Sequence, residues 1–570
     1  MSAKPTDSLS PATDGSGAAA PSTLAGLSVL HDPLRNKGTA FTHKEREALG
    51  LNGLLPAAYN TQDQQAERTW ATLSQIEKPL DRYRELTSLQ DRNEYLYYRV
   101  LMDHLQELMP IVYTPTVGAA TQHFSRVFQR GRGVWITPDH IGRVQEILAN
   151  ATARRDIRLL VVTDNESILG IGDQGAGGMA ISIGKLSLYT AAAGIAPEQT
   201  LPISLDVGTD NQALLDDPNY LGWQKPRLRG PLYESLVEEF VSAVKALFPK
   251  ALLQWEDFRK SNALTLMERY RPQLLSFNDD IQGTGAVTLA GVMSALRVKQ
   301  ERLSAQRIVI HGAGAAGLGI AQQIKAALAA EGIERHLMHE HLALLDSRGL
   351  LVDDQDYADG YKRTLAWPAA FAKAQGLGES ADRDLDAVVA RYQPTVLIGT
   401  SGTPGVFDEP IARAMLAATP RPVILPLSNP TANAEATPEA LLQWTDGAAI
   451  IATGSPFQPV TLNGREHKIG QGNNVFIFPG LGLGSLHVEA SAISDGMITA
   501  AAQALADAMT EAELASGLLY PDVSRLRAVT ARVATAVAAA AVKEGLSHMP
   551  APGLEAIEQS MWRPVYPQHV

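Results

Sequence analysis

Apolar residues follow two different patterns along the chain, and the first is helical. Apolar positions three and four residues apart recur through 70–76 and 95–109, as expected for amphipathic helices. The segment 110–118 interrupts this pattern with two prolines and a glycine around Tyr113, which indicates an ordered loop. From the local sequence alone, a surface turn is the simpler explanation of Tyr113.

From about residue 132 the pattern changes to short apolar, β-branched runs separated by helical segments. The runs at 159–163, 201–207 and 252–255 have the composition of buried parallel strands. The first leads into 170–178, where five of nine residues are glycine and the backbone can approach a ligand closely. The helix that follows carries Lys185, although a lone lysine on a helix is usually solvated.

A second strand, glycine turn and helix begins at 307–310. In the sequence His311-Gly312-Ala313-Gly314-Ala315-Ala316-Gly317, the first glycine allows a tight turn, Gly314 lets a pyrophosphate approach, and Gly317 packs helix on strand. Asp346 ends the next strand and suits the adenosine ribose hydroxyls, at a spacing longer than the usual ~20 residues. A glycine-rich βαβ unit without a ligand is the alternative.

Three more apolar strands, 396–399, 423–427 and 449–452, each end in a polar loop. Repeated polar loops after strand ends predict a doubly wound sheet with a ligand-binding edge. Asn429 lies in one of these loops, and Asn474 lies in a later polar turn. Asparagine can bind a carboxylate or an amide, but it is also a common turn residue.

Two acidic pairs interrupt apolar surroundings, at Glu256-Asp257 and at Asp279-Asp280. Burying a carboxylate without a partner costs several kcal/mol. Four converging carboxylates would favour a hard cation, and such oxygen ligands suit Mg²⁺ or Mn²⁺. The alternative is that Asp279 and Asp280 cap a helix beginning near Ile281.

Composition narrows the functional classes. The 570 residues suffice for several domains, and 45% hydrophobic with 19% charged residues is typical of a globular protein. The net charge of −12 argues against a nucleic-acid partner, and the absence of cysteine excludes disulfides and thiolate metal sites. No apolar run reaches the ~18 residues of a membrane span, so we expect no membrane partner. Residues 1–30 have neither secretory nor transit character and are predicted to be a disordered tail of a cytoplasmic protein.

Taken together, these motifs resemble the malic enzyme family, and within it the bacterial NAD-type branch. The resemblance extends from about residue 36 to the C-terminus. The matching segments are 40–42, 45–46, 113–118, 170–178, 184–185, 206–209, 256–258, 277–284, 427–431 and 472–474.

The resemblance implies an α/β fold with three parts and two tails. These parts are a helical N-terminal domain at 31–131, a central parallel-sheet α/β domain at 132–278 and 475–545, and a Rossmann-like NAD-binding domain at 279–474. The last segment, 546–570 with Trp562, is expected to be a docking tail. The family also implies a homodimer or a homotetramer.

The same resemblance implies a reaction and a set of residue roles. Malate would be oxidised and decarboxylated to pyruvate and CO₂ while NAD is reduced. Glu256, Asp257 and Asp280 would bind Mn²⁺ or Mg²⁺. Lys185 would be the general base, with Asp279 as its carboxylate partner, and Tyr113 the general acid. Asn429 and Asn474 would bind malate, and Gly312, Gly314, Gly317, Asp346 and Asn429 would contact NAD. The charge of Asp346 favours NAD over NADP, although Arg348 lies close in sequence.

One position departs from the family pattern. Ser167 stands where malate-oxidising members usually carry an arginine that helps to hold a substrate carboxylate. Arg259 or Lys260 could supply a replacement cation. Malolactic enzymes, which convert malate to lactate with retained NAD, also lack the arginine and are the alternative within enzymes. A catalytically idle NAD-binding protein is the alternative of a different class.

Overall fold

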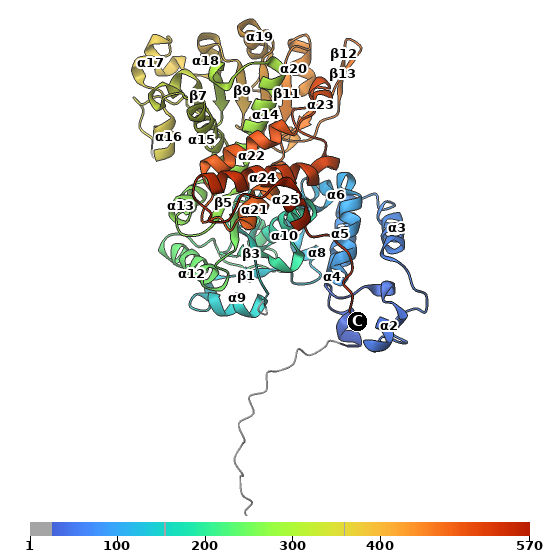
Figure 1. Cartoon of the computed structure of the whole chain (residues 1–570). Coiled ribbons are helices and arrows are strands. Elements are labelled where there is room, and N and C mark those ends of the chain that lie inside the picture. The colour runs from blue at the N-terminus through green and yellow to red at the C-terminus, as the bar shows by residue number, and fades with distance from the viewer. Residues whose placement is uncertain (1–24, 153–154, 358, 570) are drawn as a thin grey trace, which may run out of the picture.

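The chain folds around two β-sheets whose strands are mostly parallel, with a helical lobe at one side (Figure 1). The computed structural model describes residues 25–152, 155–357 and 359–569. Most of the predicted N-terminal tail, residues 1–24, therefore lies outside the described residues. Its last part is ordered, since α1 (Leu27–Leu30) forms a helix whose Val29 packs with Phe41 and Leu51.

The N-terminal lobe is helical, as predicted. Its further helices are α2 (His43–Ala48), α3 (Gln62–Leu73), α4 (Pro79–Arg92), α5 (Glu94–Asp103), α6 (Leu105–Val112), α7 (Thr116–Gln122) and α8 (Phe124–Val127). The prediction of a loop over 110–118 was wrong for most of its length, because α6 continues through Pro110 and α7 begins at Thr116. Burial of Leu108, Ile111 and Val112 stabilises α6 despite the backbone donor that proline lacks.

The central sheet contains five parallel strands in the order β1-β3-β2-β4-β5. The strands are β1 (Val134–Ile136), β2 (Leu159–Thr163), β3 (Thr200–Leu205), β4 (Leu252–Trp255) and β5 (Ser276–Asn278). Every residue of β2, β3, β4 and β5 is buried, which explains the apolar run of β2 and the mostly apolar sequences of β3 and β4. The helices of this region are α9 (Val144–Thr152), α10 (Met179–Leu188), α11 (Gln212–Leu215), α12 (Pro231–Leu247) and α13 (Lys260–Tyr270).

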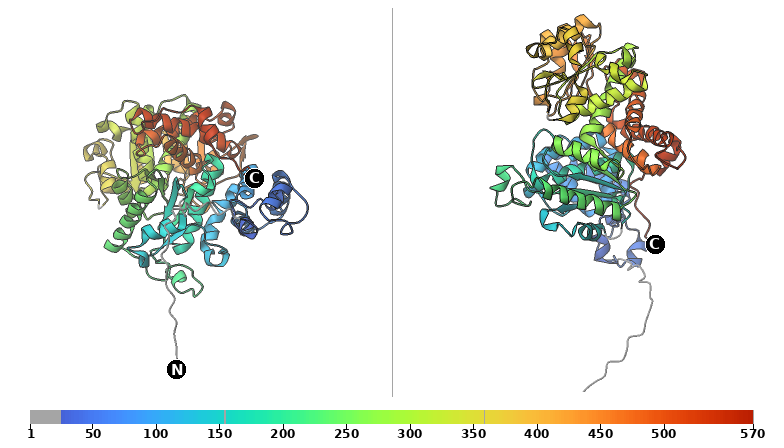
Figure 2. Two further views of the ribbon diagram at one scale, coloured as in Figure 1. Left: turned by 60° about the horizontal axis from the view of Figure 1, so that its bottom comes forward. Right: turned by 90° about the vertical axis from the view of Figure 1, so that its left-hand side faces the viewer.

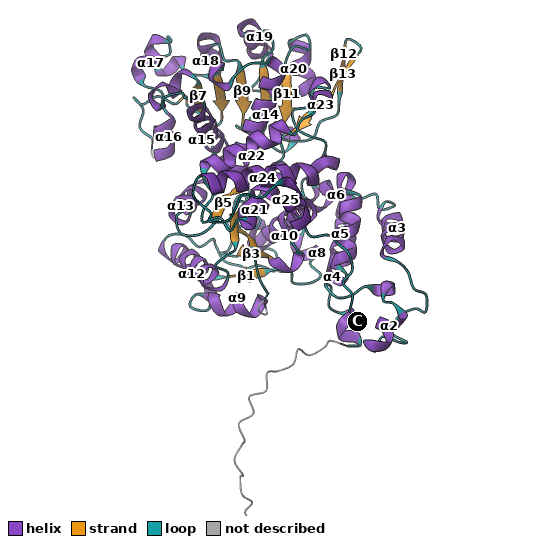
Figure 3. Cartoon of the chain, in the orientation of Figure 1, coloured by secondary structure: helices purple, strands orange, loops and turns teal. Residues whose placement is uncertain are grey.

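The second sheet has seven strands in the order β14-β11-β10-β9-β6-β7-β8. They are β6 (Ile308–His311), β7 (Leu342–Asp346), β8 (Gly349–Leu350), β9 (Val396–Gly399), β10 (Val423–Pro426), β11 (Ile450–Thr453) and β14 (Gly470–Gln471), and β7–β8 is the antiparallel pair. The strand order reverses between β6 and β9, which is where doubly wound sheets bind dinucleotides. The strand arrows of this sheet point toward the central domain (Figure 3).

Helices complete the second domain and join it to the first. Those of the second domain are α15 (Ala315–Ala330), α16 (Gly360–Leu365), α17 (Ala369–Ala374), α18 (Leu385–Tyr392), α19 (Glu409–Ala418) and α20 (Pro438–Trp444), with a hairpin of β12 (Val460–Leu462) and β13 (Arg465–His467). The remaining helices are α14 (Thr284–Lys299), α21 (Phe478–His487), α22 (Asp495–Asp507), α23 (Glu511–Ala515), α24 (Leu526–Lys543) and α25 (Leu554–Ser560). Figure 2 shows α22 and α24, in red, beside the junction of the two domains.

Two glycines bring α14 and α15 into backbone contact. A Cβ atom on Gly285 of α14 would lie 2.7 Å from the carbonyl oxygen of Gly319 on α15, and one on Gly319 would overlap the carbonyl of Ile281. Any side chain at either position would therefore separate α15 from the turn that leads into α14.

The C-terminal segment lies along the N-terminal lobe. Trp562 contacts the rings of Tyr95 and Tyr98, at centroid distances of 5.4 and 5.7 Å. The Tyr566 hydroxyl accepts a hydrogen bond from Asn93 at 2.8 Å. Across the described part of the chain, no helix is both long and apolar enough to cross a membrane.

Candidate active site

Three carboxylates meet at the carboxyl edge of the central sheet. Trp255 pairs with Asn278 at the ends of the adjacent strands β4 and β5. The residues that follow these strands therefore come together in space. Oxygen atoms of Glu256, Asp257 and Asp280 all lie within 4.8 Å of one another.

The backbone at Asp257 is shaped by this meeting. Its φ of 58° is uncommon for a residue other than glycine. The Asp257 amide donates to Oδ2 of Asp280 at 2.8 Å, and its Oδ1 accepts from the amide of Leu169 at 3.2 Å. The strained turn thus points the Asp257 carboxylate between the loop after β2 and the loop after β5.

Asp279 and Asp280 begin a π-helical turn, Asp279–Gly283, that runs directly into α14. The side chain of Asn278 caps this turn by accepting from the amide of Ile281 at 2.9 Å. The capping alternative for Asp279 and Asp280 is therefore wrong, because the preceding residue caps the turn and leaves both carboxylates to face the site.

The donor set fits a hard cation. Oδ2 of Asp257 and Oδ1 of Asp279 are buried and have no hydrogen-bond partner. Burial raises the pKa of Glu256 and of Asp257 well above their ordinary values. Burial, together with the neighbouring Asp279 charge, raises the pKa of Asp280 to about 6. A bound Mn²⁺ or Mg²⁺ would neutralise the carboxylate charge and give these oxygens a partner.

Lys185 projects from α10 into the same site, and its side chain is only 1% exposed. The ammonium bonds to Asp279 and lies 3.0 Å from Oε1 of Glu256. It also lies 5.1 Å from the ring centroid of Tyr113 and 4.4 Å from that of Phe478. Lys185 is therefore not a solvated surface lysine.

The protonation of this lysine and tyrosine follows from their surroundings. Burial lowers the pKa of Lys185, but the charges of Asp279 and Glu256 outweigh burial and raise that pKa well above its ordinary value. Burial raises the pKa of Tyr113 well above its ordinary value, against the lowering effect of Lys185. In this state Lys185 is an ammonium and Tyr113 a neutral phenol, and Tyr113 is buried rather than part of a surface turn.

The two asparagines occupy different places. The amide of Asn474 donates to Oδ2 of Asp279 at 3.0 Å and to the hydroxyl of Thr284 at 3.1 Å. Asn474 therefore belongs to the carboxylate cluster. Asn429 lies in the loop after β10, where its Oδ1 accepts from the hydroxyl of Ser455 at 2.5 Å.

The loop after β2 faces the second domain. A Cβ atom on Gly170 would lie 2.7 Å from the carbonyl oxygen of Asn429, so the two loops are in direct contact. Ser167, in the same loop, is exposed, and its amide donates to the carbonyl of Asp257 at 3.0 Å. Ser167 therefore adjoins the carboxylate cluster through backbone, with its side chain toward solvent.

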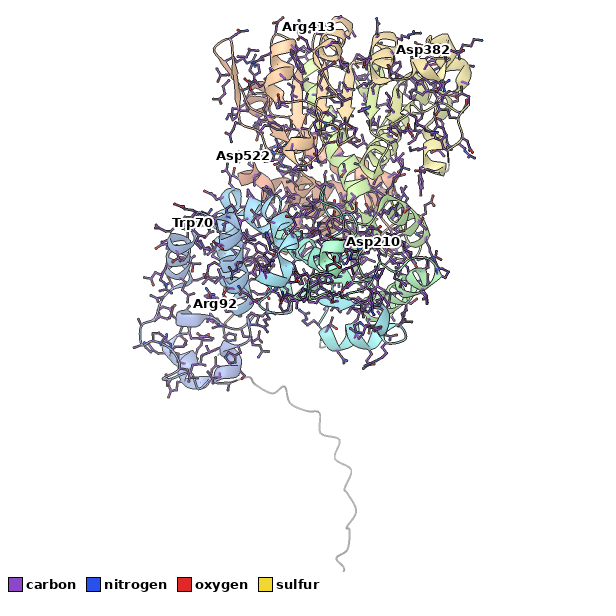
Figure 4. All side chains as sticks on the ribbon, turned by 180° about the vertical axis from the view of Figure 1, so that it is seen from behind. Trp70, Arg92, Asp210, Asp382, Arg413 and Asp522 are labelled. Carbon is purple, nitrogen blue, oxygen red and sulfur yellow. The ribbon has the colours of Figure 1, made fainter. Side chains whose placement is uncertain are left out.

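Two arginines surround the carboxylate next to Ser167. Arg229 pairs with Glu166 at 2.7 Å and with Asp210 at 2.6 Å, and Asp210 lies on the side of the central domain seen in Figure 4. Arg259 approaches the same Glu166 at only 3.8 Å, and its side chain is 60% exposed. The sequence offers Arg259 and Lys260 as replacements for the missing arginine, and among the described residues Arg259 forms only this long ion pair.

Lys260 instead bridges the two domains. Its ammonium donates to the backbone carbonyl of Ala313, in the glycine turn after β6, at 2.9 Å. It also pairs with Asp359, next to α16, at 2.7 Å. The residue that begins α13 is thus bound to the second domain and is not available to a substrate carboxylate.

The glycine turn after β6 has the geometry that the sequence predicted. Gly312 has a φ of 121°, and a Cβ atom there would lie 2.5 Å from the backbone of Thr400. A Cβ atom on Gly317 would overlap the carbonyl of Gly312. Gly314 caps α15 and would meet nothing within 4 Å, so open space lies above the helix N-terminus where phosphates bind.

Asp346 ends β7 beside this turn, but it is not a free carboxylate. Lys362 of α16 pairs with it at 2.5 Å, and its Oδ1 accepts from the amide of Arg348 at 2.8 Å. Partial burial raises the pKa of Asp346, yet these bonds outweigh burial and hold that pKa below its ordinary value. No sequence motif links Lys362 to Asp346, because the two residues lie 16 positions apart in different elements.

Glu435 was also missed, although it organises the cofactor-side loops. This fully buried carboxylate accepts from the amide of Ser401 at 2.8 Å and from the hydroxyl of Ser428 at 2.5 Å. It thereby joins the loop after β9 to the loop after β10. The one sign of this link in the sequence is that a serine lies two residues after the end of each strand, at Ser401 and at Ser428.

Comparison with known proteins agrees with this architecture. The family description "Malic enzyme, N-terminal domain" matches residues 90–271, and "Malic enzyme, NAD binding domain" matches residues 281–542. The NAD-dependent malic enzymes of Sodalis glossinidius and Edwardsiella ictaluri are 46% and 47% identical over 544 and 545 residues, covering 95% of this chain and 96% of each relative. The solved malic enzyme of Entamoeba histolytica has the same fold, with a TM-score of 0.54 and 21% identity over 90% of each chain. The chain belongs to the malic enzyme family.

Proposed function

We propose that this chain oxidises and decarboxylates malate to pyruvate and CO₂ with reduction of NAD, with Mn²⁺ or Mg²⁺ as cofactor. The observation that carries the proposal is the meeting of a buried lysine, a buried tyrosine and a carboxylate cluster at one sheet edge. The relatives named NAD-dependent malic enzyme match almost the whole chain, which supports the same overall reaction.

Glu256, Asp257 and Asp280 would hold the cation, and the open space at Gly314 would take the NAD pyrophosphate. When bound, the cation offsets the carboxylate charge that keeps Lys185 an ammonium and polarises the C2 oxygen of malate, while NAD accepts the C2 hydride. Asn429 and Asn474 supply neutral hydrogen bonds for the substrate, and Ser167 lies at the edge of the same space.

Two buried groups move the protons. Lys185, as the neutral amine, takes the proton of the 2-hydroxyl group, and Asp279 orients its nitrogen. Hydride loss and proton loss give oxaloacetate, and departure of C4 as CO₂ leaves the enolate of pyruvate. Tyr113, beside Lys185, gives its phenolic proton to C3 and is reprotonated by the Lys185 ammonium.

We propose the domain division predicted from the sequence, with 31–131, 132–278 with 475–545, and 279–474 as the three parts, and 546–570 as the C-terminal tail. The gap between the two matched family segments, at 272–280, supports a boundary near the end of β5. A homodimer or homotetramer in the cytoplasm stays a prediction, and the oligomer is measured by light scattering on the purified protein.

The roles of the proton-transfer residues are tested by two substitutions. Lys185→Ala should reduce malate oxidation by about 10²–10⁴-fold, the usual value of a general acid or base, with little change in NAD affinity. Tyr113→Phe should impair pyruvate formation most clearly when oxaloacetate is supplied. Steady-state rates and NAD titrations measure both. A loss below tenfold in both variants would remove these residues from the mechanism.

Cation binding should weaken as the pH falls. Since the pKa values of Glu256, Asp257 and Asp280 are raised, the cation-free protein retains protons on these groups, and cation binding must release them. We expect the Mn²⁺ dissociation constant to rise, as the pH falls through these raised pKa values, by roughly tenfold per pH unit for each proton released. Asp280→Asn should weaken Mn²⁺ binding at every pH. A dissociation constant unchanged between pH 5.5 and 8 contradicts the assignment.

NAD should be preferred over NADP. The carboxylate of Asp346 opposes a 2′-phosphate, and Lys362 and Arg348 offset only part of this effect. We expect a higher kcat/KM with NAD in the wild type and a smaller preference in Asp346→Ser. A higher kcat/KM of the wild type with NADP would overturn the expectation.

The products decide between the malic and the malolactic reactions. We expect free NADH and pyruvate, because base, acid and cation ligands are all present and only the charge at Ser167 is missing. A neutral hydrogen bond in place of charge-assisted ones costs on the order of 1–2 kcal/mol, or roughly tenfold to thirtyfold in malate binding. Ser167→Arg should therefore lower the KM for malate without changing the product. Stoichiometric lactate without NADH release would support the malolactic reaction instead.

A further inference from the structure

A chain of two hydrogen bonds leads from Tyr189 through Gln254 to Glu256. Gln254 is the polar residue of β4, whose other members are Leu252, Leu253 and Trp255, and it is fully buried. Its Nε2 donates to Oε2 of Glu256 at 2.7 Å. Its Oε1 accepts from the hydroxyl of Tyr189 at 2.5 Å.

The direction of both bonds is fixed by chemistry. A carboxylate that binds a cation is ionised and only accepts, so Gln254 must then turn its NH₂ group toward Glu256 and its carbonyl toward Tyr189, as it does here. The Tyr189 hydroxyl must then donate. A phenol that donates at one end therefore sets the amide orientation that the carboxylate needs at the other end.

The fold makes room for Tyr189. This fully buried residue begins a π-helical turn, Tyr189–Ala193, that continues α10, and it lies four residues after Lys185 on the same helical face. A Cβ atom on Gly482 of α21 would lie 2.6 Å from the tyrosine ring. The ring also packs on Phe478 at a centroid distance of 4.9 Å. A glycine at this position of α21 is what admits the ring.

The two oxygen atoms of the Glu256 carboxylate have different partners. Oε1 faces the Lys185 ammonium at 3.0 Å, and Oε2 faces the Gln254 amide. Without the amide, attraction to Lys185 alone would decide how this carboxylate rotates. The amide therefore opposes collapse of Glu256 onto the lysine.

We propose that Gln254 and Tyr189 are positioning residues that hold Glu256 in the orientation required by the divalent cation and thereby set the cation affinity. The proposal rests on the proposed function for the presence of that cation. Hydrogen bonds behind a metal ligand typically change metal affinity by about 10–100-fold. Tyr189 acts through Gln254, since within the described part of the chain its hydroxyl forms a hydrogen bond to Gln254 and to no other member of the site.

The test is Mn²⁺ binding to the full-length protein without substrate, followed by electron paramagnetic resonance of free and bound Mn²⁺. Gln254→Met keeps the volume and removes the amide, and Tyr189→Phe removes only the hydroxyl. Each should weaken Mn²⁺ binding by about tenfold. The double variant should bind no more weakly than Gln254→Met, because the two residues act in series.

Tyr97→Phe is the matched control. Tyr97 is equally buried, and its hydroxyl reaches Ser187 at 3.2 Å instead of an amide next to the site. It should bind Mn²⁺ like the wild type, and NAD affinity should be unchanged in all these variants. An altered spectrum of bound Mn²⁺ in Tyr189→Phe would add support that a merely structural role does not give.

The outcomes separate this inference from the function on which it rests. If Asp280→Asn weakens Mn²⁺ binding while Gln254→Met and Tyr189→Phe stay within twofold of the wild type, only the positioning role is lost. Additive losses in the double variant, or an equal loss in Tyr97→Phe, overturn it as well. If Asp280→Asn binds Mn²⁺ normally, the cation site itself is misassigned and both proposals fall.

Discussion

Repulsion between buried carboxylates is the constraint on which the rest of the site depends. Glu256, Asp257, Asp279 and Asp280 meet at the end of two adjacent strands, and among the described residues Lys185 supplies the one opposing charge that bonds to them. Charge of this density in a buried place destabilises the chain unless a cation shares it. The fold therefore keeps this unfavourable charge at the point where the proposed cation would bind.

The backbone around the cluster is also irregular. Asp257 has a positive φ, and α10 and α14 each adjoin a π-helical turn. Tyr189 begins one of these turns, and Asp279 and Asp280 begin the other. Such irregularities cost free energy locally, and packing of the surrounding elements over-determines them.

The sequence predicted the parts whose physics is local. The run 396–399 coincides with β9, because a strand buried on both faces favours continuous apolar residues, and 252–255 coincides with β4 although it includes the polar Gln254. The glycine turn at Gly312 is equally local, since a positive φ must be accommodated within the turn. Long-range pairs were not predictable: Lys362 meets Asp346, and Glu435 joins two serine loops, only after the second domain has folded. The predicted loop at Pro110 was wrong for the same reason: burial of α6 in the folded lobe outweighs the local cost of a proline within the helix.

The contact of Gly285 with Gly319 sets the distance between two parts of the site. Backbone rests on backbone there, because a Cβ atom on Gly319 would overlap the carbonyl of Ile281, the residue that follows Asp280. The glycine turn after β6 leads into α15, and Asp280 lies in the turn that leads into α14. The spacing between α15 and the carboxylate cluster is therefore set by backbone atoms, and it does not depend on how any side chain rotates.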